Sequence, residues 1–116
     1  MSDDVQALQA ALRQFADERD WSQFHTPKNL AASLSVEAAE VLEHFQWLTD
    51  EQSKNLPPEQ RDKVALEIAD VLLYLLQLAD KLQIDPVAAA KDKLAINAEK
   101  YPVDKARGSS KKYTEL

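Results

Sequence analysis

Four carboxylates, arranged as two pairs at helical spacing, constrain the fold of this chain more than any other feature. Glu37 and Glu40 form one pair, and Glu67 and Asp70 form the other. Side chains three residues apart lie on the same face of an α-helix. Glu37 also falls within the apolar stripe of its expected helix, where a carboxylate is costly unless something neutralises it. That stripe consists of Leu30, Leu34, Val41, Phe45 and Leu48. We therefore expect helices that bring four acids together around a divalent metal ion.

Length and composition favour a single all-α domain of 116 residues. One glycine and no cysteine argue against sheet-rich turns, disulfides and thiolate metal sites. The formal net charge of -6 disfavours nonspecific nucleic-acid binding, although an acidic protein can bind a polyphosphate when metal ions supply positive charge. The chain has no long apolar run for a membrane span, and its acidic start does not resemble a signal peptide. We expect a cytoplasmic protein without nucleic-acid or membrane partners.

Prolines and capping residues divide the chain into four main helices, giving a four-helix-bundle-like fold. Thr26 and Asp85 are each followed by proline, which is favoured at the first helical position behind a capping residue. The expected helices span residues 3–18, 26–48, 57–83 and 85–102. Residues 20–25 and 49–56 are expected to be connectors. The basic segment 103–116 is expected to be a flexible tail, so the predicted domain spans residues 1–102.

The third expected helix carries more apolar surface than one thin bundle needs. Its core stripe consists of Val64, Ile68, Val71, Leu75, Leu78 and Leu82. Three further apolar residues, Leu72, Leu76 and Ala79, widen that stripe. A helix that is apolar over so much of its surface is buried on several sides, and oligomerisation is the simplest way to bury it.

The four acids suit Mg²⁺, which prefers oxygen ligands and keeps some of its waters. Two or three such ions could clamp a triphosphate and activate a water for in-line attack on phosphorus. Two metal alternatives fit less well. A di-iron bundle uses Glu-x-x-His pairs, but His44 follows Glu40 by four residues. A zinc site would have to be built from His25 and His44 without cysteine.

The spacing of the acidic pairs, together with several short segments, resembles the all-α nucleoside triphosphate pyrophosphohydrolase superfamily, the MazG-like group. The segments point to its dCTP pyrophosphatase branch. They are WSQFHTPKNL (residues 21–30), FQW (45–47), DVLLYL (70–75), KLAIN (93–97), KYP (100–102) and SKKYTEL (110–116). The resemblance implies cleavage of a nucleoside triphosphate to its monophosphate and pyrophosphate, with Mg²⁺ (or Mn²⁺ in its place) as cofactor. It also implies a homotetramer or dimer whose active sites draw on more than one subunit.

The resemblance further assigns roles to individual residues. Glu37, Glu40, Glu67 and Asp70 would be the metal ligands and catalytic residues. The residues that would contact the phosphates or the sugar are His25, Lys93, Asn97 and Tyr101. Trp21 and Trp47 would shape the base pocket, and Tyr74 would lie beside the metals. Lys100 departs from relatives that carry arginine there, and lysine lacks bidentate phosphate geometry.

The sequence thus predicts a Mg²⁺-dependent nucleotide pyrophosphohydrolase that acts on dCTP or modified dCTP and cleans the nucleotide pool. Two alternatives remain open. One is the same chemistry on dUTP or on a broad set of nucleotides, because every base has a face that can stack. The other is a helical interaction module without enzymatic activity, whose acids bind Ca²⁺ or no ion. Convergence of Glu37 and Glu67 would favour an enzyme over the module.

Overall fold

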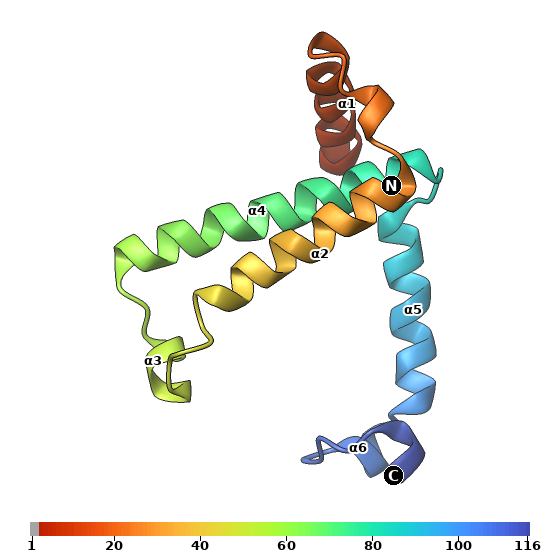
Figure 1. Ribbon diagram of the computed structural model, residues 1–116. Coiled ribbons are helices and arrows are strands. Elements are labelled where there is room, and N and C mark those ends of the chain that lie inside the picture. The colour runs from red at the N-terminus through yellow and green to blue at the C-terminus, as the bar shows by residue number, and fades with distance from the viewer. Residues whose placement is uncertain (1–2) are drawn as a thin grey trace. The chain divides into compact units, whose positions relative to one another are not determined.

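The computed structural model describes residues 3–116, which form helices joined by short loops (Figure 1). The elements are α1 (Asp3–Glu18), η1 (Ser22–Phe24), α2 (Pro27–Glu43), α3 (Asp50–Lys54), α4 (Pro58–Lys81), α5 (Pro86–Lys100), α6 (Val103–Ala106) and η2 (Tyr113–Glu115). The described part of the chain contains no strand, which agrees with the all-α prediction. No helix in residues 3–116 is long and apolar enough to cross a membrane. The chain divides into two compact units, one ending at Ile84 and the other beginning at Asp85.

An antiparallel pair of helices, α2 and α4, forms the centre of the first unit (Figure 1). Thr26 begins α2 as predicted, because its Oγ1 accepts a hydrogen bond from the Asn29 amide at 3.2 Å and Pro27 follows it. Leu30 of α2 is 1% exposed and is the most completely buried large side chain described. The buried apolar side chains of the described residues are Ala16, Leu30, Val64, Leu76 and Ala79. This packing fixes how the faces of α2 and α4 meet.

The prediction that the second helix continues to Leu48 was wrong, because α2 ends at Glu43. The prediction of a connector over residues 49–56 was also incomplete, since this segment contains α3. Thr49 Oγ1 accepts from the Gln52 amide at 3.1 Å, and Gln52 Oε1 accepts from the Thr49 amide at 2.9 Å. Such a reciprocal capping box starts a new helix with its first residue in an extended conformation. A continuous helix through Thr49 is therefore excluded.

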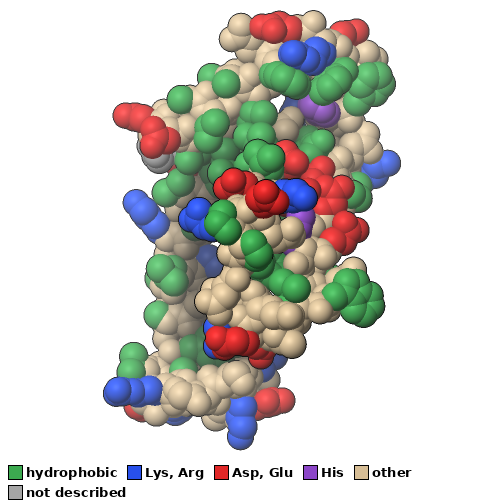
Figure 2. Space-filling model, turned by 90° about the vertical axis from the view of Figure 1, so that its left-hand side faces the viewer, with side chains coloured by type: hydrophobic (Ala, Val, Ile, Leu, Met, Phe, Trp, Pro, Cys, Tyr) green, Lys and Arg blue, Asp and Glu red, His purple; other side chains and the backbone are tan. Residues whose placement is uncertain are grey.

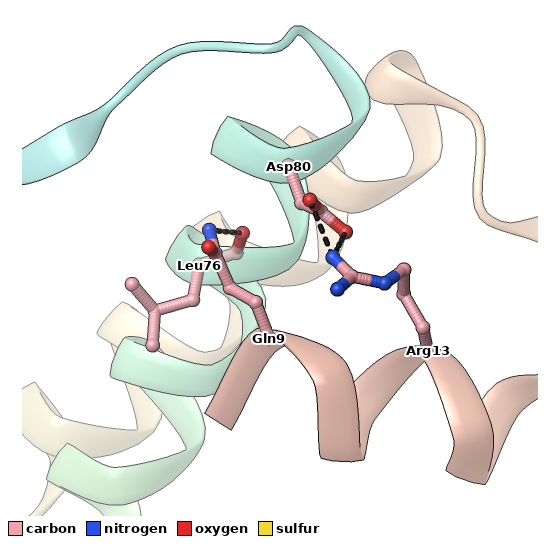
Figure 3. A network of polar contacts seen from close by, with 4 residues as sticks. All are labelled: Gln9, Arg13, Leu76 and Asp80. Carbon is pink, nitrogen blue, oxygen red and sulfur yellow. Dashed lines mark hydrogen bonds and ion pairs between the residues drawn. The ribbon is translucent and has the colours of Figure 1, made fainter. Parts of the chain in front are cut away.

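Polar contacts attach α1 to α4 (Figure 3). The buried Gln9 donates from Nε2 to the Leu76 carbonyl at 3.0 Å. One turn later, Arg13 Nη1 lies 2.8 Å from both carboxylate oxygens of Asp80. Leu8 and Phe15, on the apolar face of α1, stay 40% and 48% exposed.

The core stripe predicted for the third helix is only partly correct. Val64, Leu76 and Ala79 are buried, but Ile68, Leu75 and Leu82 are about half exposed. In the first unit α4 packs against α2 and α1, which leave much of its apolar surface uncovered. Figure 2 shows hydrophobic side chains lying among charged ones on one face of the molecule. The apolar surface of α4 is therefore larger than its neighbours in this unit can bury.

Both α1 and α4 end in a Schellman motif whose left-handed residue is not glycine. In α1 this residue is Asp20 and in α4 it is Gln83, each with φ of 54°. The amide of Trp21 donates to the Ala16 carbonyl at 2.9 Å, as the motif requires. The first motif sets the position of Trp21 directly after α1.

The second unit consists of α5 and the C-terminal segment. Asp85 caps α5 as predicted, its Oδ1 accepting from the amides of Val87 and Ala88 at 3.1 and 3.0 Å. The segment expected to be a tail includes α6 and η2. In this segment the Tyr113 ring lies edge-on to the Tyr101 ring, with the two ring centroids 5.9 Å apart. Lys100 Nζ lies 4.8 Å from the centroid of the Tyr113 ring. The tail therefore contacts the end of α5.

Candidate functional site

The packing of α2 against α4 brings acidic residues of both helices together. Glu37 of α2 and Glu67 and Asp70 of α4 each offer one carboxylate oxygen, and these three atoms all lie within 4.8 Å of one another. Two helical pairs on facing helices produce this convergence, because each pair lies on the face that meets the other. We call Glu37, Glu67 and Asp70 the acidic cluster.

Two oxygens of the acidic cluster are buried without a hydrogen-bond partner among the described residues. They are Oε2 of Glu37 and Oε2 of Glu67. A buried carboxylate oxygen without a partner is costly, and a hard divalent cation is the ligand that satisfies it. The cluster therefore fits a divalent metal ion.

The electrostatics of the cluster lead to the same conclusion. Glu40 lies beside both Glu37 and Glu67, close enough to share a hydrogen bond with either when one of the pair holds a proton. This neighbour, followed by burial and the remaining acidic charges, raises the pKa of Glu37 to about 7. The same causes raise the pKa of Glu67, and the nearby His44 opposes them. Without a cation, Glu37 and Glu67 keep their protons to a higher pH than exposed carboxyls do.

His44 and Gln60 extend the site in a way that the sequence patterns did not predict. His44 Nε2 lies 3.9 Å from Oε1 of Glu67, and its Nδ1 lies 2.6 Å from Nε2 of Gln60. An amide nitrogen can only donate, so Nδ1 accepts and the proton of a neutral ring lies on Nε2, facing Glu67. The pair thus orients a donor toward a carboxylate of the cluster. The i, i+4 step from Glu40 to His44 was the one available signal.

A cleft of about 380 Å³ adjoins the acidic cluster, because Asp70 lines both. Its lining residues are Leu8, Ala11, Leu12, Phe15, Trp21, His25, Asp70, Leu73, Tyr74 and Gln77. Three of the predicted substrate residues, Trp21, His25 and Tyr74, therefore share one cleft. The Trp21 ring lies edge-on between Phe15 and His25, with centroids 5.8 and 6.4 Å away. The combination of an aromatic wall and an acidic end suits a ligand with a flat ring and a charged chain.

Trp47 does not line this cleft. It lies in the loop before α3, is 86% exposed, and lines a separate hollow of about 740 Å³ together with His44 and Gln60. A single chain therefore does not place Trp21 and Trp47 around the same ligand.

The other predicted residues, Lys93, Asn97 and Tyr101, belong to the second unit. They follow one another at four-residue intervals along α5 and its C-terminal cap. The Asn97 carbonyl accepts from the Tyr101 amide at 2.9 Å, which closes the last turn. This spacing places the three side chains on one helix face, and their contact with a ligand stays a prediction.

Comparison with known proteins identifies the class to which this fold and acidic cluster belong. Residues 32–116 match the MazG-like family, and the chain belongs to that family.

Two relatives and one solved structure are similar to this chain over most of its length. The chain is 43% identical to human dCTP pyrophosphatase 1 and 41% identical to the mouse protein, over 98% of its own length. It spans 66% of the length of each of these relatives. It is also similar to the crystal structure of a pyrophosphatase from Archaeoglobus fulgidus, with a TM-score of 0.82 and 44% identity. That match covers 88% of this chain and 95% of the archaeal one.

Proposed function

We propose that this protein is a divalent-metal-dependent nucleoside triphosphate pyrophosphohydrolase that converts dCTP, or dCTP modified on its base, to the monophosphate and pyrophosphate. The observation that carries the proposal is the pair of buried, unpartnered oxygens on Glu37 and Glu67 at the end of an aromatic cleft. The relatives named dCTP pyrophosphatase 1 support the choice of reaction and base. Mg²⁺ is the proposed ion, with Mn²⁺ as a substitute, and a cytoplasmic location goes with this role.

Glu37, Glu67 and Asp70 would hold the metal, with Glu40 beside them. When bound, such an ion supplies positive charge to the phosphates and acidifies water. Glu40, which was expected to be a fourth ligand, lies next to two cluster carboxyls but outside the set of three, and we propose that it takes the proton of the attacking water. In the proposed reaction a bond forms between the water oxygen and the α-phosphorus. The bond from that phosphorus to the bridging oxygen breaks, and pyrophosphate leaves.

The cleft would hold the nucleoside. Trp21 and Tyr74 offer aromatic surface for the base and the sugar, and His25 offers a ring nitrogen as donor. Trp47, Lys93, Asn97 and Tyr101 are proposed to complete the substrate site as part of a homotetramer or dimer. The exposure of Trp47 is consistent with a role at a neighbouring copy of the chain.

The acidic cluster bears differently on the two alternatives, a non-enzymatic module and hydrolysis of other nucleotides. A non-enzymatic module predicts acids that face bulk solvent, whereas two cluster oxygens are buried. Hydrolysis of dUTP or of a broad nucleotide set uses the same cluster and differs only in the cleft. The first measurement therefore has to compare nucleotides as well as metals.

We would measure pyrophosphate release with Mg²⁺, Mn²⁺ or no metal across the common and 5-substituted deoxynucleoside triphosphates. We expect metal-dependent turnover that is highest for dCTP-type substrates. Turnover of no nucleotide under any metal condition would overturn the proposed function.

Glu37→Gln and Asp70→Asn test the acidic cluster. Each should lower turnover by about a hundredfold or more, the scale of losing one electrostatic group in an active site. Circular dichroism should show that the helices remain. Glu59→Gln and Asp62→Asn change exposed acids of the same kind on α4 and should retain wild-type activity. Near-wild-type turnover in either cluster variant would refute the metal assignment.

A further inference from the structure

Gln77 is the uncharged amide that lines the aromatic cleft. It lies on α4, seven residues after Asp70, with Tyr74 between them. It also lines a smaller hollow of about 110 Å³ that shares Leu12 and His25 with the cleft. The side chain is half-buried. Its position gives the cleft a polar group at the opposite end from the acidic cluster.

The orientation of this amide is fixed by a bond to its own helix. Nε2 of Gln77 donates to the Leu73 carbonyl at 3.2 Å. A carbonyl can only accept, so the nitrogen and not the oxygen of the amide faces Leu73. No donor in residues 3–116 reaches Oε1 of Gln77. Oε1 of Gln77 is therefore free to accept a hydrogen bond from a ligand, while Leu73 engages one of the two N–H groups of Nε2.

The spacing along α4 matches the layout of a nucleotide. Asp70 and Gln77 are seven residues apart, which is about 10 Å along a helix axis. A triphosphate held at the acidic cluster would place its sugar near Tyr74 and the far edge of its base near Gln77. Much of the cleft wall is apolar, formed in part by Leu8, Leu12 and Leu73.

We propose that Gln77 is a specificity-determining residue that selects bases with an exocyclic amino group at the edge remote from the sugar. This inference rests on the proposed function and names the feature of the substrate that the cleft recognises. Cytosine presents a donor, its 4-amino group, where uracil and thymine present a carbonyl. The Oε1 atom of Gln77 can accept from the amino group, whereas it would face a second acceptor on uracil. In an apolar cleft, Oε1 and the uracil carbonyl would each lose a hydrogen bond to water and gain no other in its place.

Gln77→Met tests the proposal because methionine retains the length and helix propensity of glutamine while removing the acceptor. Gln14→Met is the matched control, since Gln14 is exposed on α1 and bonds only to Glu18. We would measure kcat/KM for dCTP and dUTP with Mg²⁺ in all three proteins. We would also titrate each protein with the α,β-imido analogues of both nucleotides by calorimetry, which reports selection without hydrolysis.

Wild-type protein should prefer the cytosine nucleotide in both assays. Gln77→Met should reduce that preference about 2- to 10-fold, the factor supplied by one neutral hydrogen bond, mainly through weaker handling of dCTP. Gln14→Met should retain the wild-type preference.

The two readouts separate this inference from the proposed function. If wild-type protein binds the cytosine analogue more tightly and Gln77→Met loses that preference, the inference is supported, whether or not either nucleotide is hydrolysed. Absence of hydrolysis would refute only the proposed reaction. Hydrolysis by wild type with an unchanged preference in Gln77→Met would overturn the inference and leave the reaction standing. A wild-type preference for dUTP, or binding of neither analogue, would overturn the inference outright.

Discussion

Glu37 lies within the predicted apolar stripe of α2, with Oε2 buried and no partner for it among the described residues. Its neighbour Glu40 is the main cause of its raised pKa, and burial adds to the effect. The folded protein without metal therefore binds a proton at Glu37 that the unfolded chain releases. Because stability falls with pH wherever the native state binds more protons than the unfolded state, this residue makes the metal-free fold pH-sensitive.

The first prediction at this scale concerns stability in EDTA. The pKa of Glu37 rises from an ordinary 4.5 to about 7 on folding, so the free energy of unfolding should decrease as the pH rises through that window. Urea denaturation at intervals between pH 4.5 and 7 measures this slope. Glu37→Gln should have a shallower slope, with a remainder due to Glu67. The lowered pKa of Asp85 acts below its ordinary 3.8 and does not contribute here. Equal slopes in the two proteins would contradict the assignment to Glu37.

The part of the site that depends on spacing within a helix could be predicted from the sequence. The part that depends on contacts between helices could not be predicted. The i, i+3 pairs were enough to predict that Glu37, Glu67 and Asp70 come together, because each pair must lie on one face. The bond between His44 and Gln60 depends on the register of α2 against α4, which no local pattern encodes. The same is true of Trp47, whose separation from Trp21 depends on where α2 ends.

At the scale of single elements, the helix ends determine where the site residues lie. The end of α4 repeats the motif that ends α1, with the Gln83 amide donating to Asp80 at 3.1 Å and the Ile84 amide donating to Ala79 at 2.9 Å. Gln83 occupies the left-handed position, where a β-carbon is strained and glycine is preferred. The motif satisfies the last carbonyls of α4 at a conformational cost.

Gln83→Gly should therefore stabilise the protein. Relief of the left-handed strain should raise the free energy of unfolding by about 1–2 kcal/mol. The greater conformational freedom of glycine in the unfolded chain should lower it by about 0.5–1 kcal/mol. We expect a net increase of up to about 1.5 kcal/mol in the free energy of unfolding, measured by urea denaturation. Gln83→Ala is the control, since it removes the same side chain but keeps the β-carbon and should bring no such gain. Destabilisation by the glycine variant would show that the strain is absent.

Capping chemistry predicted helix starts well and helix ends less well. Thr26 and Asp85 carry strong signals, side-chain acceptor followed by proline, and both helices begin there. The short α3 was missed because a helix of 5 residues shows no periodicity, although Thr49 and Gln52 spell out its capping box. Apolar periodicity past Glu43 suggested a longer α2 and was outweighed by that cap.

For the whole molecule, the exposed apolar surface of the first unit is the main feature. Leu66 of α4 is 70% exposed and Leu42 of α2 is 59% exposed, while few large side chains are buried. Surface of this kind is uncommon unless another chain covers it. The sequence predicted the excess of apolar residues on α4 but not which of them the neighbouring helices cover.

We therefore expect the protein to form an oligomer in solution. Light scattering coupled to size-exclusion chromatography should give a mass that is a multiple of the 13.1 kDa chain. Leu66→Glu should shift that mass toward a single chain, because a carboxylate is costly to bury in an apolar contact. Lys28→Glu, an exposed change on α2, should leave the mass unchanged. A wild-type mass of one chain at micromolar concentration would refute the expectation.

The attachment of α1 has a consequence for how the cleft behaves. Gln9 and Arg13 hold this helix to α4 by hydrogen bonds and one ion pair, while Leu8, Leu12 and Phe15 face the cleft. One wall of the cleft is thus held to α4 by polar contacts, while its large apolar side chains Leu8 and Phe15 remain exposed. A ligand that filled the cleft would cover these side chains as a neighbouring core residue does. Under the proposed function the base of the nucleotide would take that place, so binding would also stabilise the packing of α1 against α4.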